Sequence, residues 1–293
     1  MNERFAAEPS ACDTALEFKY LLEKFGPATG RYLAAYPDVG WELQLRTHLE
    51  PWDELQRARA LTSLRRAKEA RSLVRSPGCA YEQSSTWLSN VEKVQMTMRR
   101  FDQVVVSRAN AGTFASIDDL DLPPTAAVPV LARAADYVRS SRMLLVTAPE
   151  LHFIDPYLDP VDASRVRVLE EMLREAATGK CEGAVVWVAA GRLKCSVGES
   201  IASLKRAALK SGFKAPRRIT LRTFTDATRS VKVHDRYLLC LFGAIRFEHG
   251  FQELACGRTA RVSPENPSSH VSLVQTYMEG RHDMDVDDFV VDA

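Results

Sequence analysis

The sequence lacks the patterns that identify several large classes of protein. Its 293 residues include six cysteines, but no two form a Cys-x-x-Cys pair and their spacing matches no zinc-binding pattern. No apolar run reaches the roughly 18 residues of a membrane span, and the first residues have no apolar core of signal-peptide length. These absences predict a reduced, cytoplasmic protein without a structural metal.

Two catalytic signatures and a strong charge are missing as well. The chain has no nucleophile-elbow motif, and Gly191 and Gly198 are too far apart to form a loop that cradles phosphate. We therefore expect no nucleotide cofactor. The net charge is only +1, so any surface for a charged partner must arise from local clustering.

The first part of the chain is predicted to be helical. Apolar residues recur at helical spacing after Asp13, over about residues 52–75 and over about residues 84–100. Breaks rich in glycine and proline separate these segments. We therefore expect a helical N-terminal domain over residues 1–115.

A linker and a second domain are predicted to follow. Residues 116–129 carry acidic residues and the pair Pro123-Pro124, which are typical of a linker. Beyond it the patterns alternate, with helices expected near 130–140, 163–177 and 200–211, and strands near 143–148, 151–155, 183–190 and 218–225. This alternation predicts an α/β domain over residues 130–293, with a mixed β-sheet flanked by helices.

The last strand is predicted to lead into a β-hairpin with a polar cluster. A two-residue turn at Phe242-Gly243 places Arg236 opposite His249 on the neighbouring strand. Lys232 and His234 share the face of Arg236 because side chains alternate along a strand. Such a set of cationic donors suits a phosphate oxyanion. The alternative for His234 is an ordinary hydrogen-bonded strand histidine.

A second polar stretch, Asp155-Pro156-Tyr157, follows the predicted strand near 151–155. Ligands of open α/β sheets bind at the carboxyl ends of the strands, so Asp155 is expected to orient the cationic cluster and Tyr157 to line the pocket. The alternative is plain turn chemistry, since Asp-Pro starts turns and helices unaided. His152, just upstream, is expected to be structural.

These stretches resemble a known active site. His234-Asp235-Arg236-Tyr237, a glycine-containing turn and His249-Gly250-Phe251 look like the active-site hairpin of the phospholipase D-like superfamily. Together with the Asp-Pro-Tyr stretch, they are most similar to the degenerate type found as the C-terminal domain of some MIT-domain proteins. The resemblance covers about residues 140–280 and implies a phospholipase D-like fold for this region.

The resemblance also implies roles for individual residues. The implied catalytic residues are His234, Arg236 and His249, and the implied phosphate-binding residues are Lys232, Asp155 and Tyr157. An active protein of this kind is a metal-independent phosphodiesterase that works through a phosphohistidine. The chain departs from the family pattern, since Arg236 replaces a lysine, Leu241 an aspartate and Glu248-His249 a Gly-Ser pair. A single motif also means that a complete centre requires a homodimer.

Two functions therefore remain open. The first is a protein that binds a phosphodiester of nucleic acid, as a nuclease component of a bacterial antiphage or restriction system. The second is a catalytically dead interaction or scaffold subunit of a multiprotein complex. Membrane-phosphoinositide binding also follows from the resemblance, but the chain offers no amphipathic anchor helix for it.

Two charged segments complete the prediction. The helix near residues 52–75 and its end carry candidate nucleic-acid-binding residues, which are Arg57, Arg65, Arg66, Lys68 and Arg71. The alternative is a solvated helix face. The acidic last fifteen residues are expected to form a solvated tail, and a second hypothesis is that they mimic a phosphate backbone and cover the chain's own basic surface.

Overall fold

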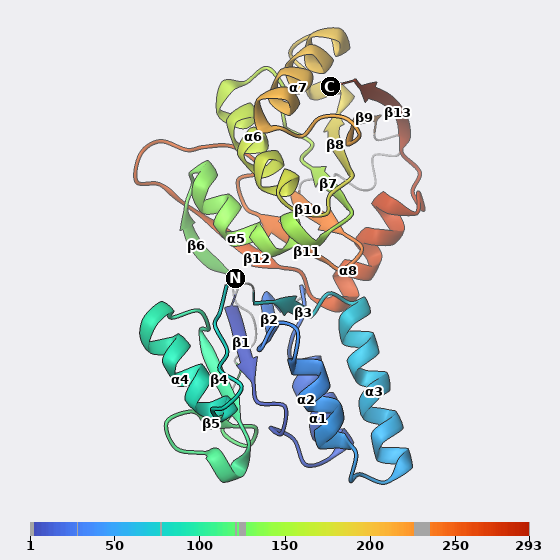
Figure 1. The fold of residues 1–293 in the computed structure, drawn as a ribbon. Helices are drawn as coiled ribbons and strands as arrows, with labels where there is room; N and C mark the ends of the chain where they lie inside the picture. Colours follow the sequence, from blue (N-terminus) through green and yellow to red (C-terminus); the bar gives the residue numbers. More distant parts are fainter. Residues whose placement is uncertain are drawn as a thin grey trace. The chain divides into compact units, whose positions relative to one another are not determined.

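A computed structural model of the chain describes residues 3–27, 29–76, 78–120, 122, 127–225 and 235–292. The chain divides into two compact units, which meet in sequence at residue 124, and each unit has its own β-sheet (Figure 1). Among the helices of these residues, none is long and apolar enough to cross a membrane.

The N-terminal unit is an α/β structure, so the prediction of a purely helical domain was wrong. Its parallel sheet has the order β3-β2-β1-β4-β5. The strands are β1 (Glu3–Ala7), β2 (Arg31–Ala35), β3 (Leu73–Arg75), β4 (Gln103–Val106) and β5 (Ala115–Ser116). The helices are α1 (Ala15–Glu23), α2 (Trp41–Leu49), α3 (Glu54–Glu69), α4 (Trp87–Met98) and the short η1 (Arg108–Asn110).

The missed strands are short and poor in strand-forming residues. β1 and β2 each end in two alanines, which have a low intrinsic preference for strands. Burial decides their conformation instead, because Phe5, Ala6 and Leu33 are fully buried. Only β4, with three consecutive valines, carried a clear strand signal.

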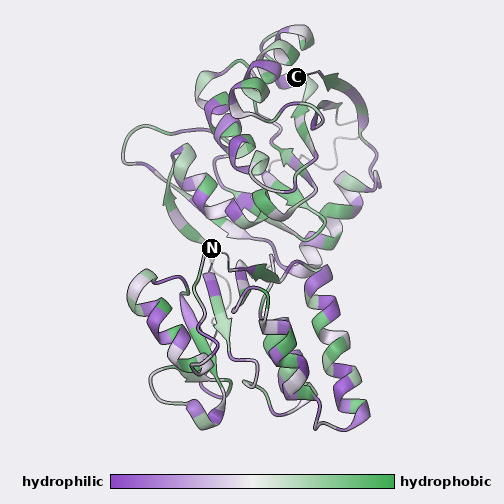
Figure 2. Ribbon diagram, in the orientation of Figure 1, coloured by the Kyte–Doolittle hydropathy of each residue, from purple (hydrophilic) through white to green (hydrophobic). Residues whose placement is uncertain are grey.

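Helices cover both faces of this sheet. The apolar sides of α1, α2 and α3 pack in one core with Phe5 and Leu33 of the strands. Near α4, the indole Nε1 of Trp87 donates a hydrogen bond of 2.7 Å to the backbone carbonyl of Tyr36, just after β2. The hydropathy colouring in Figure 2 shows the mixture of hydrophilic and hydrophobic residues along these helices, as expected for helices with one buried side.

One arginine ties together three segments of the N-terminal unit. Arg108, just after β4, donates to Asp13 at 2.6 Å, Glu17 at 2.8 Å and Asp118 at 2.7 Å. The guanidinium lowers the pKa of Glu17 and of Asp118 below the ordinary values of 4.5 and 3.8. A lowered carboxyl pKa stabilises the folded state above the ordinary value, and this stabilisation is lost as the pH falls through the folded value.

Arg108→Ala is therefore expected to lower the melting temperature by several degrees at pH 7 and by a smaller amount at pH 3, where the carboxylates begin to be protonated. Thermal unfolding followed by circular dichroism at both pH values measures this difference. Arg57→Ala is the control, because Arg57 is exposed and has no ion-pair partner among the described residues. An Arg108→Ala deficit of equal size at both pH values would show that its carboxylate contacts are not the cause.

The C-terminal unit has an eight-stranded mixed sheet flanked by helices. The prediction of a mixed sheet with flanking helices is thus confirmed. The sheet order is β13-β9-β8-β7-β10-β11-β12-β6, in which β7, β8 and β9 are parallel and the other neighbours antiparallel. The strands are β6 (Val128–Leu131), β7 (Glu150–Ile154), β8 (Gly183–Ala189), β9 (Arg218–Thr225), β10 (Tyr237–Cys240), β11 (Gly243–Phe247), β12 (Thr259–Pro264) and β13 (Asp285–Val291). The helices are α5 (Ala134–Thr147), α6 (Ala163–Ala177), η2 (Ala190–Arg192), α7 (Val197–Ser211), α8 (Pro267–Leu273) and the π-helical η3 (Val274–Met278).

Three segments of this unit differ from the prediction. Residues 128–131, predicted as the end of a linker and the start of a helix, form the edge strand β6, which pairs with β12. Residues 143–148, predicted as a strand, lie mostly in α5, where Met143, Leu144 and Leu145 face the core. A short apolar run cannot by itself distinguish a strand from the buried side of a helix. The acidic C-terminal segment is not a tail, because residues 285–291 pair with β9 as strand β13, and Asp288 forms an ion pair with Arg222.

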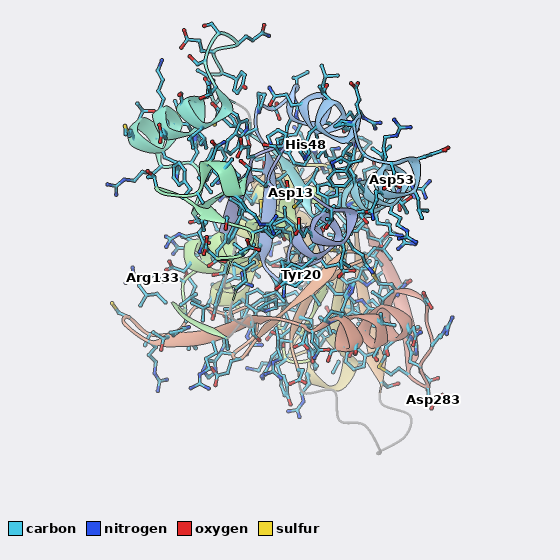
Figure 3. The ribbon with its side chains drawn as sticks, turned by 90° about the horizontal axis from the view of Figure 1, so that it is seen from below. Asp13, Tyr20, His48, Asp53, Arg133 and Asp283 are labelled. Carbon is cyan, nitrogen blue, oxygen red and sulfur yellow. The ribbon has the colours of Figure 1, made fainter. Side chains whose placement is uncertain are left out.

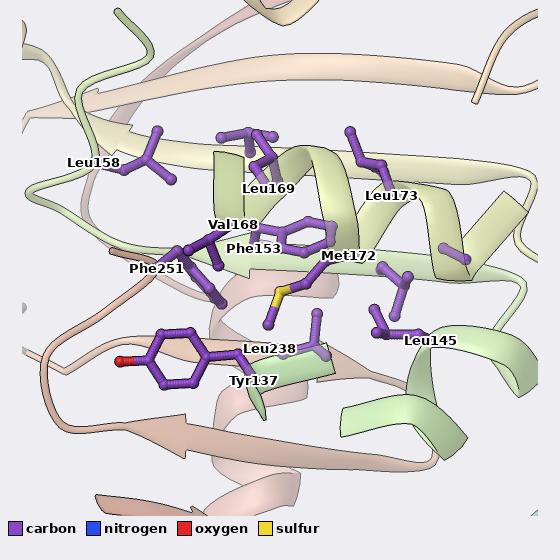
Figure 4. Close-up of a cluster of buried hydrophobic side chains, with 14 of the residues drawn as sticks. Tyr137, Leu145, Phe153, Leu158, Val168, Leu169, Met172, Leu173, Leu238 and Phe251 are labelled. Carbon is purple, nitrogen blue, oxygen red and sulfur yellow. The ribbon is translucent and has the colours of Figure 1, made fainter. Parts of the chain in front are cut away.

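The main core lies between the sheet and helices α5, α6 and α7. Figure 4 shows Val168 and Met172 of α6 over Phe153 of β7, with Leu238 of β10 beside them. The other sheet face carries a smaller cluster around Trp187, next to α8 and η3. Both faces of β8 are thus covered, which explains why this strand is entirely apolar.

Candidate phosphate-binding site

Three polar side chains come together where β7 and β8 end and β10 begins. Asp155 follows β7, Arg192 ends the η2 turn after β8, and Arg236 directly precedes β10. Because β10 runs antiparallel to β7, with Tyr237 opposite Ile154, its amino end meets the carboxyl end of β7. The carboxyl ends of parallel strands are where open α/β sheets bind ligands.

Asp155 is the buried centre of this site. Its residue is only 2% exposed, and its carboxylate accepts the amides of Tyr157 at 2.9 Å and Phe251 at 3.2 Å. Burial raises the pKa of Asp155, while these amides and the nearby Arg236 act in the opposite direction. The carboxylate therefore fixes two loops and a guanidinium at the same point.

Gly250 makes this arrangement sterically feasible. Its φ is +71°, and a Cβ added there would lie 2.2 Å from Oδ2 of Asp155 and 3.3 Å from Cγ of Arg236. A side chain of any size would thus overlap the buried carboxylate, and the backbone conformation favours glycine. The turn before Phe251 can approach Asp155 only because residue 250 has no side chain.

Arg236 is held by three neighbours. Its Nη1 donates to the carbonyl of Glu248 at 2.9 Å, and its Nε lies 3.8 Å from Oδ1 of Asp155. Its Cζ lies 4.7 Å from the ring centroid of Tyr157, a cation–π distance. The Nε atom is buried and has no hydrogen-bond partner among the described residues, whereas the side chain as a whole is 27% exposed, so a ligand would be bound by the Nη groups.

Arg192 is a site residue that the sequence reasoning missed. Its Cζ lies 4.9 Å from the ring centroid of the same Tyr157, and its side chain is exposed. Tyr157 therefore interacts with two guanidinium groups. Its position in the sequence could have identified it, because Arg192 follows the apolar strand at 183–189 just as Asp155 follows β7.

The hairpin register differs from the prediction. Cys240 pairs with Gly243, so the turn is Leu241-Phe242, one residue earlier than expected. The earlier turn shifts the pairing by two residues, and Arg236 lies opposite Phe247, whose amide donates to its carbonyl at 2.9 Å. The predicted pairing of Arg236 with His249 was therefore wrong.

His249 lies in the turn after β11, with a half-exposed side chain whose Nε2 is 4.0 Å from Oε2 of Glu248. Among the described residues, the His249 ring contacts none of Asp155, Tyr157 and Arg236, so the structure does not bring it together with them. Lys232 and His234 lie outside the described residues. Of the predicted site residues, the structure thus brings together Asp155, Tyr157 and Arg236.

His152 is structural, as expected. Its Nδ1 accepts a hydrogen bond of 3.1 Å from the indole of Trp187, which leaves the proton on Nε2. Nε2 lies 2.7 Å from Oε1 of Glu150 and donates to it. Both ring nitrogens of this buried histidine are therefore occupied. Within the described ranges, no cluster of three or more histidine, cysteine or acidic side chains is arranged to hold a metal ion.

The five predicted nucleic-acid-binding residues of the N-terminal unit do not form one surface. Lys68 pairs with Glu42 at 2.7 Å and Arg65 lies 4.0 Å from Glu69, whereas Arg71 follows α3 in a left-handed conformation. The other two, Arg57 and Arg66, are exposed, and in the described part of the chain neither has an ion-pair partner.

Comparisons with known proteins add little. No protein-family model and no curated protein matches the chain. Among solved structures, it is similar to TrmBL2, an archaeal chromatin protein described as showing a novel mode of DNA binding. The identity is 14% over 91% of this chain and 90% of that chain, with a TM-score of 0.30, which carries no argument about fold or function.

Proposed function

We propose that the C-terminal unit binds a phosphodiester group of nucleic acid at the site formed by Arg192, Tyr157 and Arg236. One observation carries the proposal, namely that two guanidinium groups lie over a single tyrosine ring at the carboxyl ends of adjacent parallel strands. Guanidinium groups bind phosphate through paired hydrogen bonds and remain charged at every physiological pH.

The electrostatic arrangement supports an anionic ligand. Among the described residues, the carboxylate that contacts the site is that of Asp155, which lies 3.8 Å from Arg236, so the site with two guanidinium groups keeps one positive charge uncompensated. Arg192 has no ion-pair partner among the described residues. The resemblance to phospholipase D-like proteins supports the same ligand class, a phosphodiester.

Binding is better supported than cleavage by the described residues. Asp155 is buried and hydrogen-bonded, which suits a positioning residue rather than a nucleophile. Hydrolysis would rest on His234, the residue that the family resemblance implies, with a homodimer supplying the second half of the centre. If the site also cleaves the bound phosphodiester, the protein would act as a nuclease of an antiphage or restriction system. If it does not bind nucleic acid, the alternative is a scaffold subunit.

The test measures binding of fluorescent single- and double-stranded DNA and RNA by anisotropy. Arg192→Ala and Arg236→Ala are each expected to weaken binding about tenfold, because a hydrogen bond to a charged group contributes about 1.5–3 kcal/mol and this site is partly exposed. Arg206→Ala and Arg258→Ala remove exposed arginines that make no contact with the site among the described residues, and they are expected to change affinity less than twofold.

Cleavage is followed in the same samples on denaturing gels, with and without EDTA, and with His234→Ala. Cleavage that survives EDTA and is lost in His234→Ala supports the nuclease. Binding without cleavage supports the phosphate-binding role alone. Equal affinity of Arg192→Ala, Arg236→Ala and the wild type, or the absence of any binding, contradicts the proposal and favours the scaffold.

A further inference from the structure

We propose that a groove between α1 and α3 of the N-terminal unit binds the sugar–phosphate backbone of nucleic acid as a second contact. The inference rests on the proposed function for the class of ligand, but on different residues and a different unit. The groove has a volume of about 680 Å³, and its polar lining comprises Lys19, Gln56, Arg59, Thr62, Ser63 and Arg66. Figure 3 shows α1, which carries Tyr20, and α3, whose N-cap residue is Asp53.

The lining has cations and no acids. Lys19 comes from α1, and Arg59 and Arg66 come from α3. In the described part of the chain, neither arginine has an ion-pair or hydrogen-bond partner for its guanidinium. Lys19 has only Glu23, at 3.6 Å between two exposed side chains, which is a weak interaction. All three charges are therefore available to a polyanion.

The spacing along α3 suits a continuous backbone. Arg59 and Arg66 are seven residues apart on one side of the helix, which corresponds to about 10.5 Å along its axis. That length matches about three nucleotides of one strand at roughly 3.4 Å each. Thr62 and Ser63 lie between the two arginines and offer hydroxyl groups, and such side chains are frequent partners of phosphate oxygens.

On the opposite side of α3, the cationic side chains are paired with carboxylates of the chain. There Lys68 and Arg46 both pair with Glu42, at 2.7 and 2.8 Å, and Arg65 lies near Glu69. These residues line a separate groove of mixed charge. Of the α3 arginines without an ion-pair partner in the described part of the chain, Arg59 and Arg66 line the groove that faces α1, whereas Arg57 does not line it.

An acidic peptide is the competing occupant. Leu16 in the groove and Tyr20 beside it are 75% and 46% exposed, so an amphipathic acidic segment would find apolar contacts there. The unpaired arginines with hydroxyls between them favour the phosphate backbone instead, because they supply hydrogen bonds to oxygens along the whole groove rather than a single apolar anchor.

The experiment compares two double variants of the full chain that remove the same charge. Arg59→Ala/Arg66→Ala removes the groove arginines, and Arg46→Ala/Arg65→Ala removes two exposed arginines from the other side. Affinity for a fluorescent 20-nucleotide DNA is measured by anisotropy at several salt concentrations. The groove variant is expected to bind about tenfold more weakly at low salt, with the slope of log affinity against log salt reduced by about 1.4–1.8.

The matched variant is expected to keep the wild-type slope and an affinity within twofold of wild type. The groove proposal is overturned if both double variants behave alike. It is also overturned if a fluorescent Glu- and Leu-rich peptide, but not the DNA, loses binding in the groove variant. If only Arg192→Ala/Arg236→Ala loses DNA affinity, the groove proposal is contradicted and the proposed function is supported. If only the groove variant loses DNA affinity, the groove proposal is supported and the proposed function is contradicted.

Discussion

Replacing Gly250 with alanine is expected to destabilise the C-terminal unit by about 3 kcal/mol. Two costs add at this position, a left-handed backbone conformation and the overlap of the new methyl group with a buried carboxylate. The φ of +71° produces the first cost, and the 2.2 Å approach to Oδ2 of Asp155 produces the second. Because Asp155 cannot move without losing two amide hydrogen bonds, the overlap cannot be relieved locally.

Gly257 provides the matched control for this variant. Its φ is +82°, but a Cβ there would meet no atom within 4 Å. Gly257→Ala should therefore show the backbone cost alone, about 1 kcal/mol. Chemical denaturation of the two variants measures the difference. Equal destabilisation of the two variants would mean that position 250 requires glycine only for its backbone conformation, and that the close approach to Asp155 does not affect stability.

Asp155→Ala is the second variant with a large expected effect, a loss of about 3 kcal/mol of stability. It leaves the amides of Tyr157 and Phe251 without their acceptor in a buried place. It also removes the carboxylate that faces the partly buried guanidinium of Arg236. The same chemical denaturation experiment measures this change.

A positioning role for Asp155 predicts more than a loss of stability. Asp155→Asn retains an oxygen for one amide, so it should recover part of the stability lost in Asp155→Ala. Since Arg236 then lacks its ionic partner, nucleic-acid affinity should remain reduced even at temperatures where the asparagine variant is fully folded. Wild-type affinity in folded Asp155→Asn would contradict a role of this carboxylate in placing Arg236.

The sequence predicted the central part of the C-terminal unit well. Residues 163–177 and 218–225 form a helix and a strand with the expected bounds. Their patterns are clear, because the helix has an apolar side and an N-cap at Asp162, and the strand alternates polar and apolar residues over positions 218–222. The N-terminal strands β1 and β2 could not be recognised in this way, since burial in a parallel sheet rather than residue preference forms them.

The site was predicted in part for a similar reason. Asp155 and Tyr157 were predicted from their position after a strand, and Arg236 from its place in the cationic stretch of the predicted hairpin. The residue that pairs with Arg236 was predicted wrongly. Moving the hairpin turn by one residue places Phe247, and not His249, opposite Arg236 on the neighbouring strand. The role of Gly250 depends on a contact between segments 95 residues apart in the chain, which no local pattern encodes.

The central claim is that Arg192 and Arg236 together bind one phosphate group across Tyr157. Calorimetric titration of wild type, Arg192→Ala/Arg236→Ala and the charge-matched Arg206→Ala/Arg258→Ala with a trinucleotide tests it most directly, because so short a ligand offers few other contacts. We expect measurable binding in the wild type and the matched control and at least a tenfold loss in the Arg192→Ala/Arg236→Ala variant. Equal affinities in all three proteins would contradict the claim.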